Sequence, residues 1–303
     1  MIALASLPRA LVGVDWGTSS LRAARIAADG SVLEEREGAR GILSVPAGGF
    51  PQVLRETCGD WLQRPGTLCL VSGMAGSRQG WREAPYCACP AGFAELARGL
   101  TWVETGRIAL VPGLACEHGG IPDVMRGEEV QVFGALSLLQ QGTGTLVLPG
   151  THSKWVRVRD AMVVGFSTCM TGEFYALLRQ HSILSRTLPA DEPPFDEHAF
   201  LRGVRAALAN GSLLRSAFGT RTLGLFDRLP PEAATSYLSG VLVGEELRAQ
   251  QPAAHETIVL VGAPALTARY AIALGSLGIP SRSLGSEATW RGLWALAQNV
   301  ELP

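Results

Sequence analysis

Two short stretches that repeat each other decide the fold. Residues 11–20 read LVGVDWGTSS, and residues 145–154 read TLVLPGTHSK. Each is an apolar run that ends in a small polar turn, with Gly17-Thr18 in the first copy and Gly150-Thr151 in the second. A continuous apolar run before such a turn is typical of a buried strand, so we expect a strand and a Gly-Thr turn in each half of the chain.

The segments after the two turns also correspond. In the first copy, apolar and polar residues alternate over 21–28, as in a strand, and an Asp-Gly hairpin signal follows. Residues 31–36 can then pair with that strand. In the second copy, residues 154–158 alternate between polar and apolar as in a strand, and residues 162–166 form the strand that can pair with it. Two copies of strand, turn, strand, turn and strand predict a duplicated domain.

The remainder of the chain predicts helices and further strands in alternation. This pattern is typical of an α/β fold with layered, mixed sheets. A chain of 303 residues also favours two domains that share a cleft, which we place at residues 1–135 and 136–303. Helices are expected over residues 51–63, 124–141, 171–181, 197–209, 231–249, 265–274 and 287–298, and strands over 68–72, 108–111, 257–261 and 280–283.

Composition excludes several classes of protein. A hydrophobic fraction of 47% excludes a disordered chain, and a formal net charge of −1 gives no bulk attraction for nucleic acid or an anionic membrane. The longest uncharged stretch, residues 130–153, is interrupted by polar and glycine residues at 140–144, so we expect no transmembrane helix. Residues 1–10 lack the basic start of a signal peptide, and the six cysteines contain no C-x-x-C pair. We therefore expect a cytoplasmic protein with reduced thiols.

The first turn combines a carboxylate with backbone amides. Asp15 ends the apolar run, and Gly17, Thr18 and Ser19 form the turn. The amides of such a turn can hold phosphate oxygens, and a nearby carboxylate can hold the hydration shell of Mg²⁺. The alternative is an ordinary hairpin with a polar tip. Since Leu148 stands where the second copy would have the acid, we expect metal at one turn and phosphate alone at the other, which suits Mg·ATP.

Seven blocks of sequence follow one another in a specific order. They are DWGTS at 15–19, SGMAGS at 72–77, GW at 80–81, APY at 84–86, VMRGEE at 124–129, LPGTHSKW at 148–155 and TGE at 171–173. In this order they resemble the 2-dehydro-3-deoxygalactonokinases, a family of the sugar kinase, Hsp70 and actin superfamily.

The resemblance implies a fold, a reaction and a nucleotide site. The fold would be two ribonuclease H-like (actin-like ATPase) domains, each a mixed sheet flanked by helices, with an interdomain cleft. The reaction would be ATP- and Mg²⁺-dependent phosphorylation of 2-dehydro-3-deoxy-D-galactonate on its 6-hydroxyl, in galactonate catabolism. Asp15 would bind the metal, Gly150, Thr151 and Lys154 the phosphates, and the turn at Gly262-Ala263 the adenosine.

Three carboxylates are candidates for the base that accepts the hydroxyl proton: Glu128, Glu129 and Asp123. The resemblance implies a base at the start of a helix that faces the cleft. Residues 127–134, GEEVQVFG, resemble that stretch of glycerol kinase-like enzymes, which favours Glu128. In the alternative interpretation both glutamates lie in a first helical turn because they suit the helix dipole.

Arginines in the motif blocks are candidates for the substrate carboxylate. Arg22, Arg78 and Arg126 could each form a bidentate pair with it, and each could instead be a solvated surface charge. Trp81 could form an apolar wall of the sugar pocket, although tryptophan is more often part of a core. His152 is given no role, since a lone histidine is more often structural.

Other functions stay open. One is a kinase for another small sugar acid, such as 2-dehydro-3-deoxygluconate, and another is a catalytically silent sensor of sugar or nucleotide. About ten residues precede the first phosphate motif, which opens with the apolar run at residue 11, so we expect no helix-turn-helix of a sugar-responsive repressor. Neither a dinucleotide-binding nor a P-loop glycine motif occurs. The expected partners are ATP and a sugar acid, without nucleic acid or membrane, and a homodimer is left open.

Overall fold

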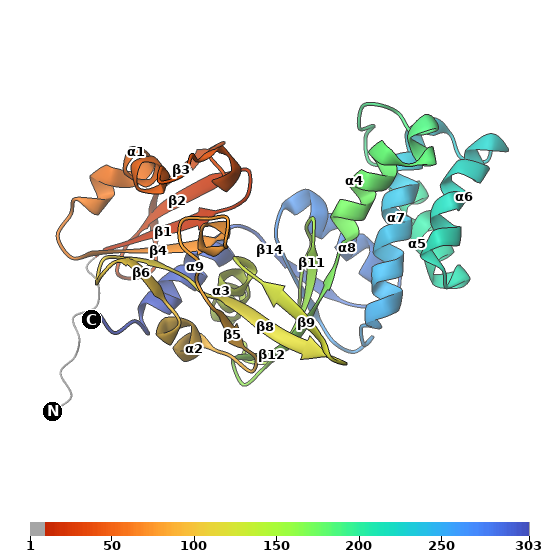
Figure 1. Ribbon diagram of the computed structural model, residues 1–303. Helices are drawn as coiled ribbons and strands as arrows, with labels where there is room; N and C mark the ends of the chain where they lie inside the picture. The colour runs from red at the N-terminus through yellow and green to blue at the C-terminus, as the bar shows by residue number, and fades with distance from the viewer. Residues whose placement is uncertain (1–9, 303) are drawn as a thin grey trace. The chain divides into compact units, whose positions relative to one another are not determined.

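Two sheets with matching strand order organise the chain (Figure 1). The computed structural model describes residues 10–302, so the expectation about a signal peptide falls largely outside the described residues. One sheet has the order β3-β2-β1-β4-β7-β6, and the other has the order β12-β11-β10-β13-β14. The strands are β1 (Ala10–Trp16), β2 (Leu21–Ile26), β3 (Val32–Gly38), β4 (Thr67–Gly73), β6 (Thr101–Glu104), β7 (Ile108–Leu110), β10 (Gly144–Leu148), β11 (Ser153–Arg159), β12 (Met162–Cys169), β13 (Ile258–Val261) and β14 (Ser281–Leu284).

Strand pairing confirms the predicted repeat. β1 pairs antiparallel with β2 and parallel with β4, and β4 continues parallel to β7. In the second sheet β10 likewise pairs parallel with β13. Because the central strands are parallel, their carboxyl ends lie at one edge of each sheet, where the Gly-Thr turns also lie. The repeat therefore places the two turns at equivalent points of their sheets.

Most helices match their predicted positions, but one begins later than expected. α3 begins at Glu128, not at 124, because Val124 and Met125 belong to strand β9 (Ile121–Met125). Gly127, with φ of 105°, separates the strand from the helix. The helices are α1 (Phe50–Leu62), α2 (Phe93–Arg98), α3 (Glu128–Leu139), α4 (Thr171–His181), α5 (Glu197–Asn210), α6 (Leu213–Leu225), α7 (Pro231–Gln250), α8 (Pro264–Gly275) and α9 (Glu287–Ala297).

A three-stranded sheet was not predicted. Its order is β5-β8-β9, with β5 (Tyr86–Ala88) parallel to β8 (Gly113–His118) and β8 antiparallel to β9. The strands are short and β8 and β9 are half exposed, so their sequence carries little apolar periodicity. This sheet leads directly into the start of α3, which explains the error in the predicted helix boundary.

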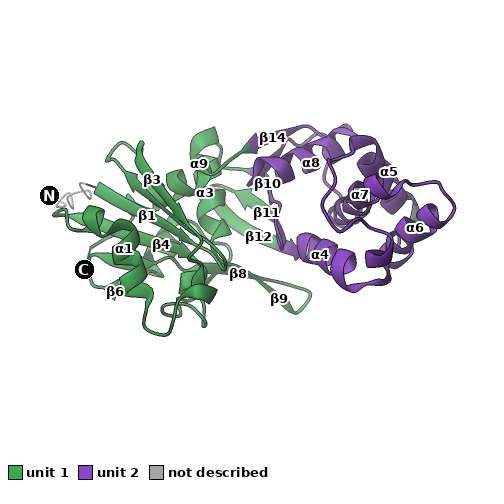
Figure 2. Cartoon of the chain, turned by 90° about the horizontal axis from the view of Figure 1, so that it is seen from above, with its two compact units in different colours: residues 1–143, 156–166, 284–303 green, residues 144–155, 167–283 purple. Residues whose placement is uncertain are grey.

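The chain divides into two compact units (Figure 2). Unit 1 comprises residues 1–143, 156–166 and 284–303, and unit 2 comprises residues 144–155 and 167–283. The C-terminal α9 thus falls in unit 1, whereas the sequence assigned it to the second domain. The reason is its packing against α3, where a Cβ added to Gly134 would lie 1.7 Å from the carbonyl oxygen of Ala288. The functional division after residue 135 stays a prediction.

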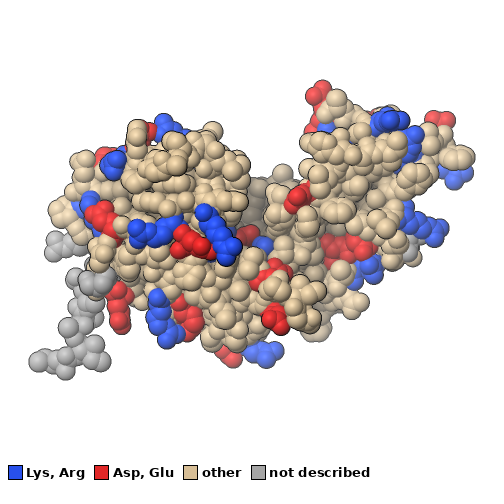
Figure 3. Space-filling model, in the orientation of Figure 1, with Lys and Arg blue, Asp and Glu red and all other residues tan. Residues whose placement is uncertain are grey.

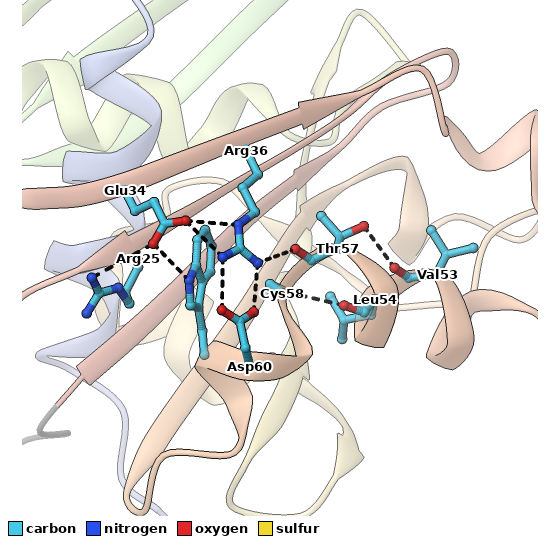
Figure 4. Close-up of polar contacts among 9 residues, drawn as sticks. Arg25, Glu34, Arg36, Val53, Leu54, Thr57, Cys58 and Asp60 are labelled. Carbon is cyan, nitrogen blue, oxygen red and sulfur yellow. Dashed lines mark hydrogen bonds and ion pairs between the residues drawn. The ribbon is translucent and has the colours of Figure 1, made fainter.

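An ion-pair network fastens α1 to the edge of its sheet (Figure 4). Arg36 on β3 donates to Asp60 Oδ1 at 2.7 Å, to Glu34 Oε1 at 2.8 Å and to the carbonyl of Thr57 at 2.8 Å. Its guanidinium also lies 4.1 Å from the ring centre of Trp61, which is buried in the core of unit 1. α1 is therefore held by both apolar burial and charge.

The surface carries charges of both signs. On the face drawn in Figure 3, Lys and Arg side chains are interspersed with Asp and Glu on a largely uncharged surface. Among the helices within residues 10–302, none is long and apolar enough to cross a membrane.

Candidate functional site

The first turn places a carboxylate at the end of β1. Asp15 Oδ2 accepts a hydrogen bond from Arg22 Nη2 at 2.5 Å, so the carboxylate is paired across β1 and β2. The amide of Gly17 donates to the carbonyl of Ser20 at 2.9 Å and closes the turn, whose tip residue Thr18 is exposed. A closed turn with an exposed tip beside a half-buried carboxylate can receive an anion together with a cation.

The ends of β1 and β4 meet the start of α3. A Cβ on Gly73 would lie 2.8 Å from the carbonyl oxygen of Trp16 and 3.5 Å from Asp15 Oδ1. A Cβ on Gly127 would in turn lie 3.2 Å from the α-carbon of Gly73. Both glycines have positive φ, 92° and 105°, so other residues would be strained there as well as crowded. These close approaches bring Asp15 and the first turn of α3 into one cluster within unit 1.

The two glutamates that open α3 have different environments. Glu128 Oε2 accepts from the amide of Arg126 at 3.0 Å, and its side chain is partly exposed. Glu129 is fully buried, and its Oε2 accepts from the amide of Gly127 at 2.6 Å. Burial, reinforced by the neighbouring charge of Glu128, raises the pKa of Glu129 to about 8. Of the two carboxylates, Glu128 is the one that a substrate can reach.

Asp123, the third candidate base, lies on a different element. It belongs to β9, where it is paired with Cys116 on β8, and its Oδ1 accepts from the amide of Val124 at 2.8 Å. It therefore stands outside the first turn of α3, where the role of base was predicted.

The three arginines have three different settings. Arg22 is paired with Asp15, whereas Arg78 is highly exposed, at 86%, and pairs with Glu83 at 2.8 Å. Arg126 is buried, and its Nη2 donates to the carbonyl of Ala84 at 2.7 Å. The geometry therefore joins Arg22 and Arg126 to the cluster and leaves Arg78 in a surface pair.

Two nitrogens of Arg126 stand out. Its Nε and Nη1 are buried and make no hydrogen bond to the described residues. The guanidinium lies 4.3 Å from the ring centre of Tyr86, and a Cβ on Gly76 would approach Nη1 to 2.8 Å. Ser77, the next residue of the same loop, also has a buried hydroxyl without a partner in the described part of the chain. Unpaired buried donors are costly, so this loop is suited to a polar ligand.

Trp81 packs in an aromatic cluster of unit 1. Its ring stacks on Phe50 with centroids 6.3 Å apart and meets Trp16 edge-on at 6.4 Å. Together with Leu54 and Val103 it lines a cavity of about 490 Å³, whose walls include neither Asp15 nor Glu128. Its role as a wall of the sugar pocket stays a prediction.

In unit 2 the second turn packs against the start of α4. The amide of Glu173 donates to the carbonyl of Thr151 at 3.0 Å, and Glu173 Oε2 lies 2.5 Å from His152 Nε2. A Cβ on Gly172 would lie 2.5 Å from the carbonyl oxygen of Gly150, so no larger residue fits there. The Thr-Gly-Glu block thus supports the turn directly.

Three further predicted nucleotide-binding residues lie near this turn. Lys154 is buried on β11, and its Nζ donates to Thr168 Oγ1 at 2.8 Å. Gly262 directly follows β13 with φ of 147°, and a Cβ there would lie 3.6 Å from the carbonyl oxygen of Pro149. Ala263 is the exposed N-cap residue of α8. The structure therefore brings the second turn and the Gly-Ala turn side by side.

Sequence reasoning missed a buried acid beneath this region. Glu246 on α7 is 3% exposed, and its Oε1 accepts from Trp155 Nε1 at 2.5 Å. Its Oε2 accepts from the hydroxyls of Tyr270, at 2.7 Å, and Thr171. The available signal was the Glu-Glu pair at 245–246 late in an otherwise largely uncharged helix.

The residues present fit Mg²⁺ only in the manner of a nucleotide-bound ion. Within residues 10–302, no group of three or more His, Cys, Asp or Glu side chains could hold a metal. Mg²⁺ commonly uses one or two carboxylates, with waters and substrate phosphates as the other ligands. The single carboxylate of Asp15 is enough to meet that requirement.

Comparison with known proteins gives concordant matches. The family profile described as 2-keto-3-deoxy-galactonokinase matches residues 15–296. A protein of Rhizobium meliloti (strain 1021) named "Probable 2-dehydro-3-deoxygalactonokinase DgoK1" is 39% identical over 95% of this chain and 96% of its own. The 2-dehydro-3-deoxygalactonokinase of Escherichia coli (strain K12) is 34% identical over 95% and 98% of the two chains.

Solved structures agree on the fold. The structure titled "Crystal structure of a putative 2-dehydro-3-deoxygalactonokinase protein from Sinorhizobium meliloti" superposes with a TM-score of 0.87 at 38% identity, covering 95% of this chain and 98% of its own. The activator of the 2-hydroxyisocaproyl-CoA dehydratase of Clostridium difficile, with bound ADPNP, has a TM-score of 0.51 at 12% identity and covers 95% and 94%. The second match shows the fold alone. The predicted α/β fold with actin-like topology is confirmed.

Proposed function

Because this chain belongs to the 2-keto-3-deoxy-galactonokinase family, we propose that it transfers the γ-phosphoryl group of ATP to 2-dehydro-3-deoxy-D-galactonate. The acceptor is the 6-hydroxyl, and the product is 2-dehydro-3-deoxy-6-phospho-D-galactonate, an intermediate of galactonate catabolism. The observation that carries the proposal is the close approach of Asp15 and Gly73 to Gly127, just before α3, in a chain whose residues 15–296 match the family.

Glu128 is the proposed general base. Its carboxylate is partly exposed at the first turn of α3. It accepts the proton of the 6-hydroxyl as that oxygen attacks phosphorus in line, and the leaving group is ADP. Phosphoryl transfer asks the protein mainly to position the reactants and to neutralise charge. Glu129, buried beside Glu128, holds the helix start and stays out of contact with the substrate.

The proposed nucleotide-binding residues lie in and beside the two Gly-Thr turns. In unit 2, Gly150 and Thr151 bind phosphate oxygens through their amides, and Gly262-Ala263 contacts the adenosine. Lys154 neutralises phosphate charge beside the second turn. In unit 1, Gly17, Thr18 and Ser19 form the other phosphate turn.

Mg²⁺ bound near Asp15 would supply neutralisation of phosphate charge. The Asp15 carboxylate is already oriented by Arg22, which holds it at the end of β1. Arg22 therefore acts on the metal site through Asp15 as well as being a candidate for the substrate.

Arg126 is the proposed partner of the substrate carboxylate. Its Nε and Nη1 are buried donors without a partner among the described residues, so each can donate to an oxygen of a charged ligand. Small movement of the loop at Gly76-Ser77 would bring a ligand oxygen to them. Arg78, exposed and paired with Glu83, is not included.

The experiment is ADP release by the purified protein with ATP and Mg²⁺, across four acceptors: 2-dehydro-3-deoxygalactonate, 2-dehydro-3-deoxygluconate, galactonate and glycerol. Turnover confined to the first acceptor supports the proposal. Equal turnover with both 2-keto acids would support kinase activity but contradict a preference for one epimer. Nucleotide binding without acceptor-dependent ADP release would contradict the kinase and favour a sensor. We also propose a cytoplasmic location, since both substrates would be intracellular metabolites.

A further inference from the structure

Glu246 connects four elements of unit 2 at one carboxylate. It lies on α7 and is 3% exposed. Its oxygens accept hydrogen bonds from Trp155 on β11, Thr171 at the start of α4 and Tyr270 on α8. Tyr270 also shares a hydrogen bond of 2.9 Å with the hydroxyl of Ser153, the first residue of β11.

The hydrogen-bond network of Glu246 reaches the second turn at two places, the start of β11 and the start of α4. Ser153 is the last residue of the turn and the first of β11, and Trp155 lies two residues further along that strand. Thr171 begins the Thr-Gly-Glu block. In this block Gly172 packs on Gly150, and the amide of Glu173 donates to the carbonyl of Thr151 in the turn. One buried carboxylate therefore holds the strand that leaves the turn and the helix start that packs on it.

Burying a carboxylate is unfavourable unless its oxygens are fully hydrogen-bonded. The three donors, an indole N–H and two hydroxyls, meet this requirement, and an apolar residue at 246 would leave all three donors without their acceptor. A fully satisfied network of this kind orients its members more strictly than apolar packing does.

We propose that Glu246 is a positioning residue that sets the geometry of the second phosphate turn, residues 149–153, through Trp155, Thr171 and Tyr270. The proposal rests on the proposed function in that the turn binds ATP phosphates. Glu246 itself touches neither ATP nor the sugar acid.

Four variants test this role. Glu246→Leu removes the acceptor, and Glu246→Gln keeps the shape and one acceptor oxygen. Thr171→Val breaks the link to α4 alone, with little loss of volume. Leu238→Ala is the matched control, because Leu238 is fully buried on the same helix but packs in an apolar cluster that includes neither Glu246 nor its partners.

Three measurements are made on each full-length variant. Amide hydrogen exchange without nucleotide reports the order of residues 149–153 and 170–174. Steady-state kinetics report KM for ATP, KM for the sugar acid and kcat separately, and thermal unfolding reports stability.

We expect Glu246→Leu to speed exchange at both segments and to raise KM for ATP about ten-fold or more, with a smaller change in KM for the sugar acid. Thr171→Val should show smaller changes in the same direction. Glu246→Gln should keep the exchange rates and KM for ATP close to the wild-type values. Leu238→Ala should lower the unfolding temperature without changing KM for ATP.

The outcomes separate this inference from the proposed function. Unchanged exchange in a folded Glu246→Leu or Thr171→Val protein overturns the positioning role, even if the wild type is a kinase. Faster exchange with unchanged ATP affinity keeps the positioning role and contradicts phosphate binding by this turn. A rise in KM for ATP that Leu238→Ala reproduces assigns the effect to general stability, and the inference fails.

Discussion

The hydroxyl of Ser72 donates a hydrogen bond of 3.4 Å to Oε1 of Glu129, and both side chains are fully buried. Ser72 lies near the end of β4, so this contact joins the sheet to the first turn of α3. The same carboxyl group accepts from the amide of Gly127 through its other oxygen. Glu129 therefore fixes the start of the helix from which Glu128 is presented.

This relationship predicts that adjacent glutamates differ in their contribution to catalysis. Glu128→Gln should lower kcat by about 10²- to 10⁴-fold, because the 6-hydroxyl loses its base, while KM for ATP stays near the wild-type value. Glu129→Gln should lower kcat far less, since a neutral amide resembles the protonated carboxyl group that a pKa of about 8 implies at neutral pH. Kinetics of both variants on the sugar acid provide the check. A larger loss for Glu129→Gln would reverse the assignment.

The raised pKa of Glu129 also predicts how stability depends on pH. From its ordinary value of 4.5 up to about 8, the folded protein retains a proton that the unfolded chain releases. The contribution of this group to the free energy of unfolding is therefore full below pH 4.5 and is lost as pH rises through that window, by at most about 1.4 kcal/mol per pH unit. Urea unfolding of wild type and Glu129→Gln at about pH 5, 6 and 7 measures the difference. Parallel pH profiles would show that Glu129 is ionised in the folded state.

The crossing of α3 and α9 predicts a sharp steric effect. A Cβ at Gly134 would lie 1.7 Å from a backbone oxygen of α9, which cannot move independently of its helix. Gly134→Ala should therefore lower the free energy of unfolding by about 3 kcal/mol or more. The control is Gly275→Ala at the end of α8, where a Cβ would meet nothing within 4 Å. There we expect a gain of about 0.5 kcal/mol from the reduced entropy of the unfolded chain. If urea unfolding gave the same change in free energy for Gly134→Ala and Gly275→Ala, the close approach of α3 and α9 at Gly134 would be contradicted.

The parts of the fold that could be predicted are those with strong periodicity. The Gly-Thr repeat indicated both sheets, and α4 was predicted to its residue bounds, because those segments follow a clear period. The β8–β9 hairpin could not be predicted, since its strands are short and partly exposed and their sequence carries little apolar periodicity. For the site, motif order identified Asp15 and Glu128 as candidates. It could not identify Glu246, whose partners on β11, α4 and α8 are distant in sequence and meet only through folding.

Arg126 and Arg78 offer a direct comparison of two arginines from the motif blocks. Arg126 is buried with two donors unpaired among the described residues, whereas Arg78 is exposed and paired with Glu83. If Arg126 binds the substrate carboxylate, Arg126→Gln should raise KM for the sugar acid about ten- to hundred-fold, the equivalent of a lost charged hydrogen bond. Arg126→Lys should recover part of this loss, because a lysine keeps the charge but not the planar fork. Arg78→Ala should leave both KM values unchanged, because its exposed pair contributes little. The measurement is KM for the sugar acid at saturating ATP, with unfolding temperature recorded for each variant. Were Arg78→Ala to raise that KM while Arg126→Gln stayed folded and kept the wild-type value, the carboxylate would be bound on the exposed loop instead.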